Sequence, residues 1–577
     1  MATKGIPYGL SDYARLSTEN YYYVDKTTYI LSIEQTASFL FLMRPRRFGK
    51  SLLLSMLESY YDINNAERFE ELFGERYIFT HETSLRAKFL IMRFDFSMID
   101  SYPTRLESSF EEYCRRQFLV FINKYEHLFK PGFREGVNAQ KTADGCLSYI
   151  NDEASFLGLN IYLIIDEYDN FTNTLLATYG TDVYRDATHG DSFYRHFFAV
   201  IKGATGGSGR ALKRMFITGV SPITLDDVTS GFNIGTNISA NTEFNGLLGF
   251  SETELRTMLG YYKEEGLLKA EIDSLVRIMK PWYDNYCFAE DAAGENMYNS
   301  DMVLYFVNNY IRTGLPPKQM VDSNIRTDYN KIRHLIRIDK ELGGNFSIVK
   351  DIIATGQTTA TINTSFPADR MVDPNNFKSL LFYFGMLSIT GVSRGEPILS
   401  IPNQTVREQL YTYLIETYQQ SEAFSIDLSR LDALMKAMAY DGQWEPVFTY
   451  IAEELNRQSR IRQYIEGEAH VKGFLQAYLG LSNLYMILPE YEANKGYADF
   501  YFQPKQPDIP FAYLVEVKYA KRDDSDAKLK ALNKEAVTQL HQYANEASVK
   551  ETLGNAQLKL IRLTFKTWEL VGMEEIT

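Results

Sequence analysis

The stretch SFLFLMRPRRFGKSLLLSML, residues 38–57, decides how the first part of the chain folds. It joins an apolar run, a short arginine-rich loop and a leucine-rich run typical of a helix. A strand, a tight loop and a helix N-terminus in this order form a phosphate cradle, because backbone N–H groups and the helix dipole converge on the anion. The general pattern is G-x-x-x-x-G-K-[ST]. Gly49, Lys50 and Ser51 fit that pattern, whereas Arg44 stands at its first glycine.

The loop predicts a nucleotide site in which Lys50 reaches the β- and γ-phosphates and the Ser51 hydroxyl holds Mg²⁺. Gly49 lets the backbone approach the phosphates closely. The residues that we expect to contact the nucleotide are Arg46, Arg47, Phe48, Gly49, Lys50, Ser51 and Leu52. We expect Arg44, Arg46 and Arg47 to add contacts to phosphates or to another part of the fold.

A second motif, NIYLIIDEYDN at residues 160–170, is an apolar strand that ends in Asp166 and Glu167. In a nucleotide site the aspartate helps to hold Mg²⁺, and the glutamate orients or activates the attacking water. Strands that merely end in acidic residues are common, but finding both motifs in this order favours a nucleotide site. The strand RMFITGV places Thr218 as a polar sensor near the γ-phosphate.

Apolar runs alternate with helical segments over residues 1–250 and predict an α/β module, namely a parallel sheet covered by helices that carries the P-loop. Residues 251–345 are predicted to form a helical lid that opens with a Ser251/Glu254 capping box. Residues 346–424 are predicted to form a connector and a winged-helix-like module, for which an α/β packing insert is the alternative. Residues 425–577 are predicted to form a further α/β domain.

The stretch YADFYFQPKQPDIPFAYLVEVKYA, residues 497–520, predicts a hairpin whose turn is centred near residue 507. That centre lies halfway between Asp499 and Glu516, so the two carboxylates are expected to face each other. Facing carboxylates need a partner, which a bound Mg²⁺ ion supplies. Lys518 lies two residues after Glu516, hence on the same face of the strand. There the lysine orients or deprotonates a water and stabilises charge on a scissile phosphate.

Several motifs resemble the bacterial AAA-ATPase-like proteins: YYYVDKT (21–27), RPRRFGKS (44–51), LIIDEYD (163–169), WYDNYCF (282–288) and IPN (401–403). The resemblance implies an ATPase module of the extended AAA class followed by a restriction-nuclease-like module. In that family an arginine at the first glycine position is usual. The resemblance also implies that Asp25 and Lys26 lie near the nucleotide. The sequence does not give the oligomeric state, although AAA-type modules often assemble into homo-oligomers.

The C-terminal residues Asp499 and Glu516-Val517-Lys518 resemble the core of the PD-(D/E)XK nucleases. The resemblance implies that Glu468, on the preceding helix, adds to the metal site, and that Gln539, on the following helix, lies close by. Two positions depart from the pattern: Tyr497 replaces an arginine, and Lys472 stands where a histidine is expected. These departures put catalytic competence in doubt more than the fold.

Composition limits the other possibilities. The formal net charge of −14 does not steer the chain to nucleic acid, so DNA binding requires local basic surfaces. The three cysteines follow no zinc or disulfide spacing, which suits a reducing compartment. The longest apolar stretch is too short to span a bilayer, which takes about 20 residues. We therefore expect a cytoplasmic protein without a membrane segment.

The leading hypothesis is an ATP-binding and ATP-hydrolysing protein that controls a Mg²⁺-dependent nuclease, with Mn²⁺ as an alternative metal at the nuclease site. Its expected partner is nucleic acid, with DNA favoured over RNA. A role in defence or mobile-element biology follows only from the resemblance to ATPase–nuclease pairs. The alternatives are an ATP-dependent signalling or assembly switch whose nuclease-like domain only binds, and an interaction protein with two decayed sites.

Overall fold

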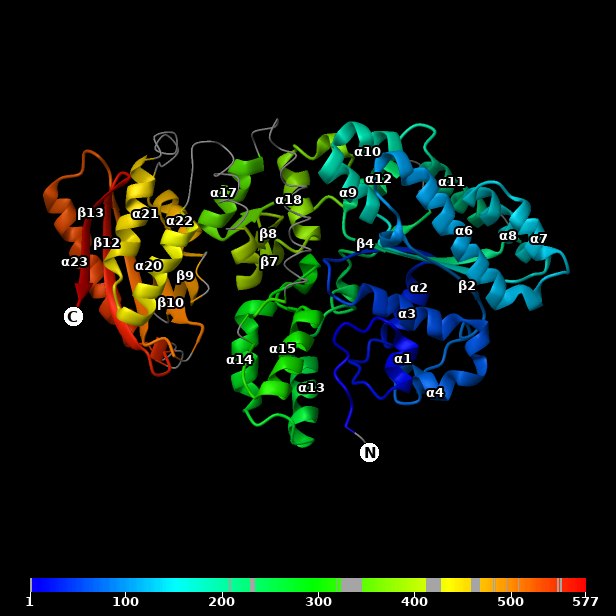
Figure 1. Ribbon diagram of the computed structural model, residues 1–577, viewed down its shortest axis with the longest axis horizontal. Coiled ribbons are helices and arrows are strands. Elements are labelled where there is room, and N and C mark those ends of the chain that lie inside the picture. Colours follow the sequence, from blue (N-terminus) through cyan, green and yellow to red (C-terminus); the bar gives the residue numbers. More distant parts are fainter. Residues whose placement is uncertain are drawn as a thin grey trace. The chain divides into compact units, whose positions relative to one another are not determined.

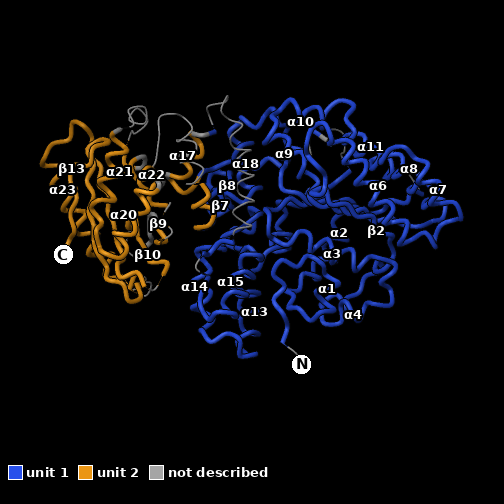
Figure 2. The backbone as a smooth tube through the Cα atoms, in the orientation of Figure 1, with its two compact units in different colours: residues 1–346, 358–403 blue, residues 347–357, 404–577 orange. Residues whose placement is uncertain are grey.

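A computed structural model describes residues 3–577 apart from 207–208, 229–233, 318, 323–344, 411–426, 458–466, 481, 483, 494–495, 507, 547–548 and 551–552. The chain forms two compact units (Figure 2): residues 1–346 with 358–403, and residues 347–357 with 404–577. The first unit takes in the predicted ATPase module and lid. The boundary predicted at residue 424 falls in a segment outside the described residues.

The first unit is built on a five-stranded sheet with the order β2-β3-β4-β1-β5, and every neighbouring pair is parallel. The strands are β1 (Phe39–Met43), β2 (Leu90–Asp95), β3 (Ile161–Asp166), β4 (Leu212–Gly219) and β5 (Thr236–Asn237). All six residues of β3 are buried, as expected of a strand covered on both faces. The predicted parallel α/β sheet is confirmed. Because β4 lies between β1 and β3, its C-terminal end separates the P-loop from Asp166.

Helices cover both faces of this sheet (Figure 1). Helix α3 (Lys50–Tyr61) packs against β2 and β3, whereas α6 (Leu106–Tyr125) packs on β2 and α11 (Phe193–Thr205) on β4. The other helices of this part are α1 (Tyr13–Thr18), α2 (Tyr29–Thr36), α4 (Phe69–Phe73), α5 (Tyr77–Thr80), α7 (Phe133–Ala139), α8 (Ala143–Phe156), α9 (Asn170–Tyr179), α10 (Thr181–Thr188) and α12 (Pro222–Val228). Many aromatic side chains fill the core between these layers.

The predicted lid is helical where it is described, with α13 (Glu252–Glu264), α14 (Ile272–Tyr283) and α15 (Ser300–Thr313). Helix α13 opens with the predicted capping box: Ser251 Oγ accepts from Glu254 N, and the Glu254 carboxylate accepts from Ser251 N. The box satisfies two N–H groups that a helix start leaves unpaired.

The middle region contains α17 (Asn345–Thr355), α18 (Pro374–Tyr383) and a three-stranded sheet with the order β6-β8-β7. Its strands are β6 (Gln357–Thr359), β7 (Ser388–Ser393) and β8 (Glu396–Ser400), and β7 pairs antiparallel with β8. Residues 411–424, which close the predicted winged-helix-like module, lie outside the described residues. The choice between a winged-helix-like module and a packing insert therefore stays open.

The second unit holds a mixed five-stranded sheet with the order β13-β12-β11-β10-β9. Its strands are β9 (Tyr485–Ala493), β10 (Gly496–Pro504), β11 (Phe511–Ala520), β12 (Gln557–Lys566) and β13 (Glu569–Ile576). Strands β11 and β12 pair parallel, and α23 (Asp526–Ala544) connects them and packs on both. Helices α20 (Leu428–Asp441), α21 (Glu445–Arg457) and α22 (Glu468–Leu479) precede the sheet. This arrangement confirms the predicted α/β class of the C-terminal part.

Candidate functional sites

The P-loop runs from the end of β1 to the first turn of α3, in the predicted order of strand, loop and helix. Gly49 is the N-cap of α3 with φ of +97°, and Arg47 has φ of +68°. A Cβ atom on Gly49 would meet no atom closer than 3.9 Å, so the left-handed backbone, rather than lack of space, favours glycine here.

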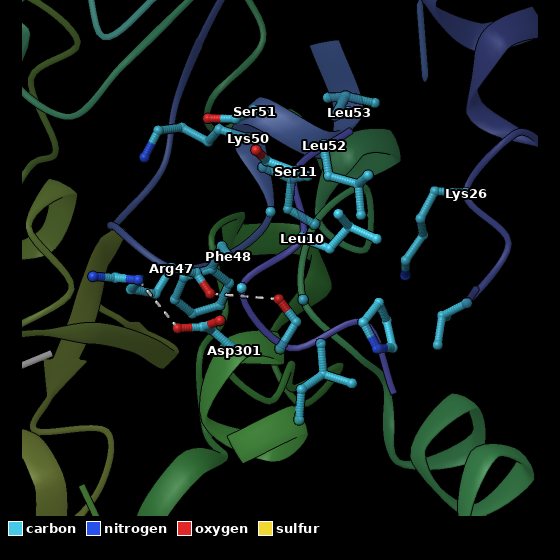
Figure 3. Close-up of a pocket in the computed structure, with 18 of the residues that line it drawn as sticks. Leu10, Ser11, Lys26, Arg47, Phe48, Lys50, Ser51, Leu52, Leu53 and Asp301 are labelled. Carbon is cyan, nitrogen blue, oxygen red and sulfur yellow. Dashed lines mark hydrogen bonds and ion pairs between the residues drawn. The ribbon is translucent and has the colours of Figure 1, made fainter. Parts of the chain in front are cut away.

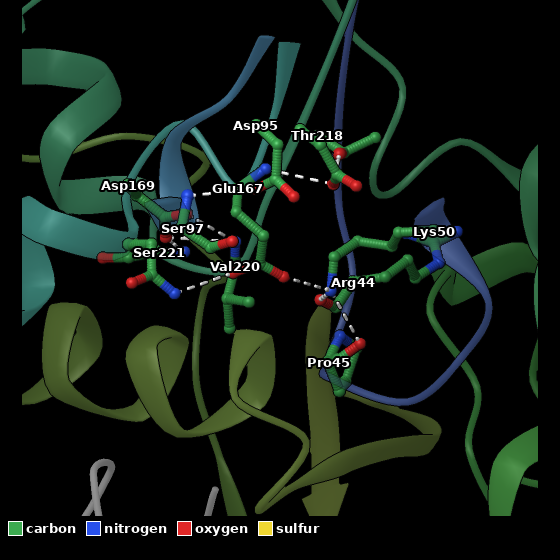
Figure 4. Close-up of polar contacts among 12 residues, drawn as sticks. Arg44, Pro45, Lys50, Asp95, Ser97, Glu167, Asp169, Thr218, Val220 and Ser221 are labelled. Atoms are coloured by element: carbon green, nitrogen blue, oxygen red, sulfur yellow. Dashed lines mark hydrogen bonds and ion pairs between the residues drawn. The ribbon is translucent and has the colours of Figure 1, made fainter. Parts of the chain in front are cut away.

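Lys50 lies buried in this loop, and its ammonium group turns back on the loop itself (Figure 4). Lys50 Nζ donates to the carbonyl oxygens of Arg44 at 3.1 Å and Pro45 at 3.2 Å, and lies 3.7 Å from Glu167 Oε1. These carbonyls are neutral, so the charge of Lys50 is only weakly compensated within the loop.

The acidic end of β3 meets the P-loop across β4. Thr218 Oγ1 donates to Asp166 Oδ1 at 2.6 Å. Burial and the nearby charge of Glu167 raise the pKa of Asp166, while hydrogen bonds from Ser51 and Thr218 oppose that rise. Glu167 has φ of +50°, an uncommon conformation for a non-glycine residue that is often found at functional positions. The structure thus brings Lys50, Ser51, Asp166, Glu167 and Thr218 together.

A cavity of about 450 Å³ opens over the P-loop (Figure 3). All seven loop residues that the sequence predicts to contact a nucleotide line it, from Arg46 to Leu52, and so does Glu167. Apolar and aromatic side chains line the cavity as well; they include Leu10, Tyr22, Leu53, Leu248 and Met258. The volume lies in the range of small-molecule sites in proteins.

The loop arginines differ in their surroundings. Arg44 is buried, does not line the cavity, and donates to the carbonyl oxygens of Ser239 and, at 2.9 Å, Phe244. Its guanidinium lies 4.2 Å from the centre of the Phe288 ring, and burial lowers the pKa of Arg44 to about 9. Arg44 therefore ties the P-loop to later segments of the chain rather than facing the cavity.

Arg47 contacts the lid helix α15. Its guanidinium lies 3.5 Å from Asp301 Oδ2, and its carbonyl oxygen accepts from Asp301 N at 3.3 Å. Next along the loop, Phe48 packs edge-on against Tyr286 at 4.8 Å, so aromatic residues of the WYDNYCF segment form a packed cluster with the P-loop. The P-loop is thus in contact with the lid through side chains and backbone.

Asp25 and Lys26, which the family resemblance places near the nucleotide, differ in their contacts. Lys26 lines the cavity and pairs with Glu254 at 2.7 Å, and burial lowers its pKa although Glu254 opposes that effect. Asp25 instead holds its own turn and α5, because its carboxylate accepts from Thr27 N and from Tyr77 N. Only Lys26 is in a position to face a ligand.

Two acidic residues of this site were missed by the sequence reasoning. Asp95 ends β2, is the register partner of Asp166 in β3, and lines the cavity. Asp169 is buried and accepts from the backbone N–H groups of Val220 and Ser221 (Figure 4). Burial and the charge of Glu167 raise the pKa of Asp169 to about 6. The run LIMRFD carried a signal for Asp95, because parallel strands end at the same edge of a sheet.

In the second unit, β10 and β11 form the predicted antiparallel pair. Phe500 is the register partner of Val515, so the next positions, Asp499 and Glu516, lie opposite each other. Asp499 Oδ2 accepts from the backbone N–H of Val517 at 2.7 Å. The hairpin predicted from the position of its turn is confirmed.

Lys518 is held by three side chains. Its Nζ lies 3.1 Å from Glu516 Oε1 and 3.3 Å from Glu535 Oε1, and it donates to Gln539 Oε1 at 2.6 Å. Tyr543 follows one helical turn after Gln539, and burial, followed by the charges of Glu516 and Asp499, raises its pKa. Helix α23 thus supplies Gln539 as expected, and also Glu535 and Tyr543, which the sequence reasoning did not single out.

Glu468 and Asp499 are bridged by Lys472. The Lys472 ammonium nitrogen lies 2.5 Å from Glu468 Oε1 and 2.5 Å from Asp499 Oδ1. Burial lowers the pKa of Lys472, but the charges of Asp499 and Glu468 outweigh burial and raise it overall. Over the part of the chain that is described, no three His, Cys, Asp or Glu side chains gather as a metal site. Glu468 therefore faces an ammonium group instead of joining the two hairpin carboxylates.

The residues nevertheless fit a hard divalent cation. Burial and the charge of Asp499 raise the pKa of Glu516 to about 7. Glu516 Oε2 is buried, and no donor among the described residues contacts it. A buried carboxylate oxygen without a partner beside a second carboxylate is a donor set that Mg²⁺ or Mn²⁺ prefers.

Comparisons with known proteins match a different family to each of the two candidate sites. Residues 7–229 match the family described as predicted AAA-ATPase, and residues 466–575 match the PD-(D/E)XK nuclease superfamily. The first match contains the P-loop, Asp166, Glu167 and Thr218. The second contains all five predicted nuclease residues, from Glu468 to Gln539.

A curated protein from Azotobacter chroococcum mcd 1, described as an uncharacterized protein in the vnfD 5′ region, is 27% identical over 332 residues. The match covers 55% of this chain and 55% of that protein, so the chain spans about half the length of its relative.

Two solved structures align weakly. Cdc6p from Pyrobaculum aerophilum is 10% identical, with a TM-score of 0.22, and covers 66% of this chain and 88% of its own. The Aeropyrum pernix Orc1 protein in complex with DNA is 11% identical, with a TM-score of 0.24. That alignment covers 69% of this chain and 91% of the Orc1 chain. Scores this low do not establish a common fold over the aligned lengths.

No helix among the described residues is long and apolar enough to cross a bilayer. The matched residues and the two candidate sites coincide in sequence. The chain thus carries an AAA-ATPase-like domain in its N-terminal part and a PD-(D/E)XK nuclease-superfamily domain in its C-terminal part.

Proposed function

We propose that this protein binds and hydrolyses ATP and that its nucleotide state controls a Mg²⁺-dependent nuclease in the C-terminal domain. The observation that carries the proposal is the presence, in one chain, of a P-loop cavity and a carboxylate hairpin with an adjacent lysine. The substrate is nucleic acid, and we favour DNA. Homo-oligomerisation and a role in defence or mobile-element biology are further parts of this proposal.

At the ATPase site, Lys50 leaves the carbonyls of Arg44 and Pro45 to contact the β- and γ-phosphates, which are stronger acceptors. Ser51 and Asp166 hold Mg²⁺, which neutralises phosphate charge when bound. Thr218 fixes the orientation of the Asp166 carboxylate through its 2.6 Å hydrogen bond. Glu167, beside the cavity, orients the attacking water.

At the nuclease site, Asp499 and Glu516 hold the divalent cation, which activates water and polarises the phosphodiester when bound. Lys518 stays near Glu516 because Gln539 accepts a hydrogen bond from its ammonium group. From there it orients the water and stabilises the charge that develops on the phosphate. Mn²⁺ suits the same oxygen ligands.

A second function has an observation in its favour. Lys472 already compensates Asp499, and Tyr497 replaces the expected arginine, so the C-terminal domain is a candidate for a binding module without catalysis. The ATPase domain would then act as a signalling or assembly switch. The cysteines that the structure describes are free and buried, which suits the cytoplasm as the proposed location.

One experiment separates the two functions. Supercoiled, linear and single-stranded DNA are incubated with the protein and Mg²⁺ or Mn²⁺, with and without ATP. We expect cleavage by the wild type, none by Asp499→Asn, and loss of the ATP effect in Lys50→Ala. Exposed Asp523→Ala and Lys88→Ala serve as matched controls.

Cleavage that persists in Asp499→Asn contradicts the nuclease site. ATP hydrolysis without cleavage under any condition supports the switch. A wild type that neither binds nor hydrolyses ATP contradicts both functions.

A further inference from the structure

We propose that Lys472 is an internal counter-ion of the nuclease carboxylates, which a divalent cation must displace, so that Lys472 limits the metal affinity of this site. The inference rests on the proposed function for the identity of the ligand, a divalent cation. It concerns a residue of this chain that departs from the PD-(D/E)XK pattern.

Helix α22 places Lys472 where it reaches two acids. Glu468 lies one turn earlier, in the first turn of the helix, where the helix dipole favours a carboxylate. Glutamate followed four residues later by lysine is the favourable order for an ion pair on a helix. The same ammonium group also reaches across to Asp499 on β10. One lysine thus links the helix to the hairpin.

The contacts of each oxygen show why a metal competes with Lys472. Asp499 Oδ2 already accepts from Val517 N at 2.7 Å, and Asp499 Oδ1 lies 2.5 Å from Lys472 Nζ. On Glu516, Oε1 faces Lys518 and Oε2 is the oxygen that no described donor contacts. A cation bound by both carboxylates therefore takes the free oxygen of Glu516, and at Asp499 it competes with Lys472 for Oδ1, the oxygen without a backbone N–H donor.

Simultaneous binding is unfavourable because the positions nearly coincide. Mg²⁺ lies about 2.1 Å from its oxygen ligands. An ammonium nitrogen 2.5 Å from the same oxygen places two positive charges within a few ångströms in a site where the Asp499 side chain is only 9% exposed. Repulsion between like charges is strong at such distances and weakly screened there. Glu468, 43% exposed, is a partner that retains Lys472 after it leaves Asp499.

The test measures Mn²⁺ binding to the full chain without nucleotide, by electron paramagnetic resonance of free Mn²⁺. Asp499→Asn identifies the part of the binding that belongs to this site. Lys472→Met keeps the length of the side chain and removes its charge, and Lys472→Gln is a second uncharged variant. Lys472→Arg retains the charge. Thermal unfolding verifies that each variant is folded.

We expect Lys472→Met and Lys472→Gln to bind Mn²⁺ at the Asp499-dependent site at least about tenfold more tightly than the wild type. Lys472→Arg should remain close to the wild type. Equal or weaker affinity in both uncharged variants overturns the proposal, and so does a lack of Asp499-dependent binding in every protein. If affinity rises but no variant cleaves DNA, the proposed nuclease function fails and the inference stands.

Discussion

The two candidate sites each contain lysines that are buried or half-buried, but these lysines face different partners. In the ATPase domain, Lys50 Nζ lies 3.1 and 3.2 Å from neutral carbonyls and 3.7 Å from the nearest carboxylate. In the nuclease-superfamily domain, Lys472 and Lys518 lie 2.5 and 3.1 Å from the hairpin carboxylates. The first site therefore keeps positive charge available for an anion. The second has already balanced its charges and accepts a cation only by rearranging.

The aspartates of the two sites also differ in the charge of the groups that contact them. Asp166 is held by the hydroxyl groups of Ser51 and Thr218, which are neutral and leave its charge available to a metal. Asp499 is held by a backbone N–H and by an ammonium group. Similar residue types thus hold an acid by neutral hydroxyl groups in one candidate site and by an ammonium group in the other.

The largest effect is expected from removing a lysine whose partner is a buried acid. Lys518→Met leaves Glu516, whose side chain is 3% exposed, without its counter-ion and should destabilise β11 by about 3–5 kcal/mol. Lys50→Met should cost its own loop only about 1–2 kcal/mol, because carbonyl acceptors lose less. Hydrogen exchange of the β11 and β1 peptides measures both.

The double variant Glu516→Gln/Lys518→Met should recover much of the lost protection, since it removes both charges. Equal effects of the two lysine substitutions would contradict the difference drawn between the sites.

The next effect concerns a buried acid of the ATPase domain. The folded protein raises the pKa of Asp169 from 3.8 to about 6, so its contribution to stability is present below about pH 4 and is lost as the pH rises through 6. The loss amounts to about 3 kcal/mol. Asp169→Asn should therefore flatten the decrease in unfolding free energy between pH 4 and 6, measured by chemical denaturation. Exposed Asp182→Asn should not change it.

A smaller effect is expected at Arg44, a buried cation that contacts carbonyls. Arg44→Lys loses the second carbonyl contact and the stacking on Phe288, at a cost of about 2 kcal/mol. Denaturation should reveal this cost with little change in nucleotide affinity. Arg46→Lys, at the cavity, should lower nucleotide affinity with little change in the free energy of unfolding. A loss of nucleotide affinity larger at Arg44 than at Arg46 would place Arg44 at the phosphates.

The smallest effect on stability is expected at the start of the lid. Ser251→Ala removes the capping box of α13 and should cost about 1 kcal/mol in local stability, seen as faster hydrogen exchange at the helix start. Because Glu254 also pairs with Lys26 at the cavity, nucleotide affinity should fall slightly. Thr253→Ala, an exposed position in the same turn, is the control.

Local sequence was enough to predict the elements and the hairpin. The β10–β11 register follows from the position of the turn, because side chains alternate along strands and the turn fixes which residues face each other. The P-loop and the strand ending in Asp166 were recognisable because each is a continuous segment. For the same reason the parallel sheet was predictable from its buried apolar runs.

The partners of individual charges were not predictable. The carbonyls that accept hydrogen bonds from Arg44 belong to Ser239 and Phe244, about 200 residues later in the chain. No local sequence pattern predicts such a contact. The bridge from Lys472 to Asp499 depends on how α22 is rotated against the sheet. The pairing of Asp95 with Asp166 required the register of β2 against β3, although the end of the apolar run marked Asp95 itself. The roles of all these residues remain predictions for the experiments above.

The division of the chain has a consequence for any attempt to cut it. Residues 347–357 belong to the second unit, whereas residues 358–403 return to the first. A single cut between residues 403 and 404 would therefore leave α17 covalently attached to the N-terminal fragment, away from the unit to which it belongs. Genetic exchange of the nuclease-superfamily domain at that point would likewise separate α17 from the unit in which it folded. A functional transplant needs both segments together.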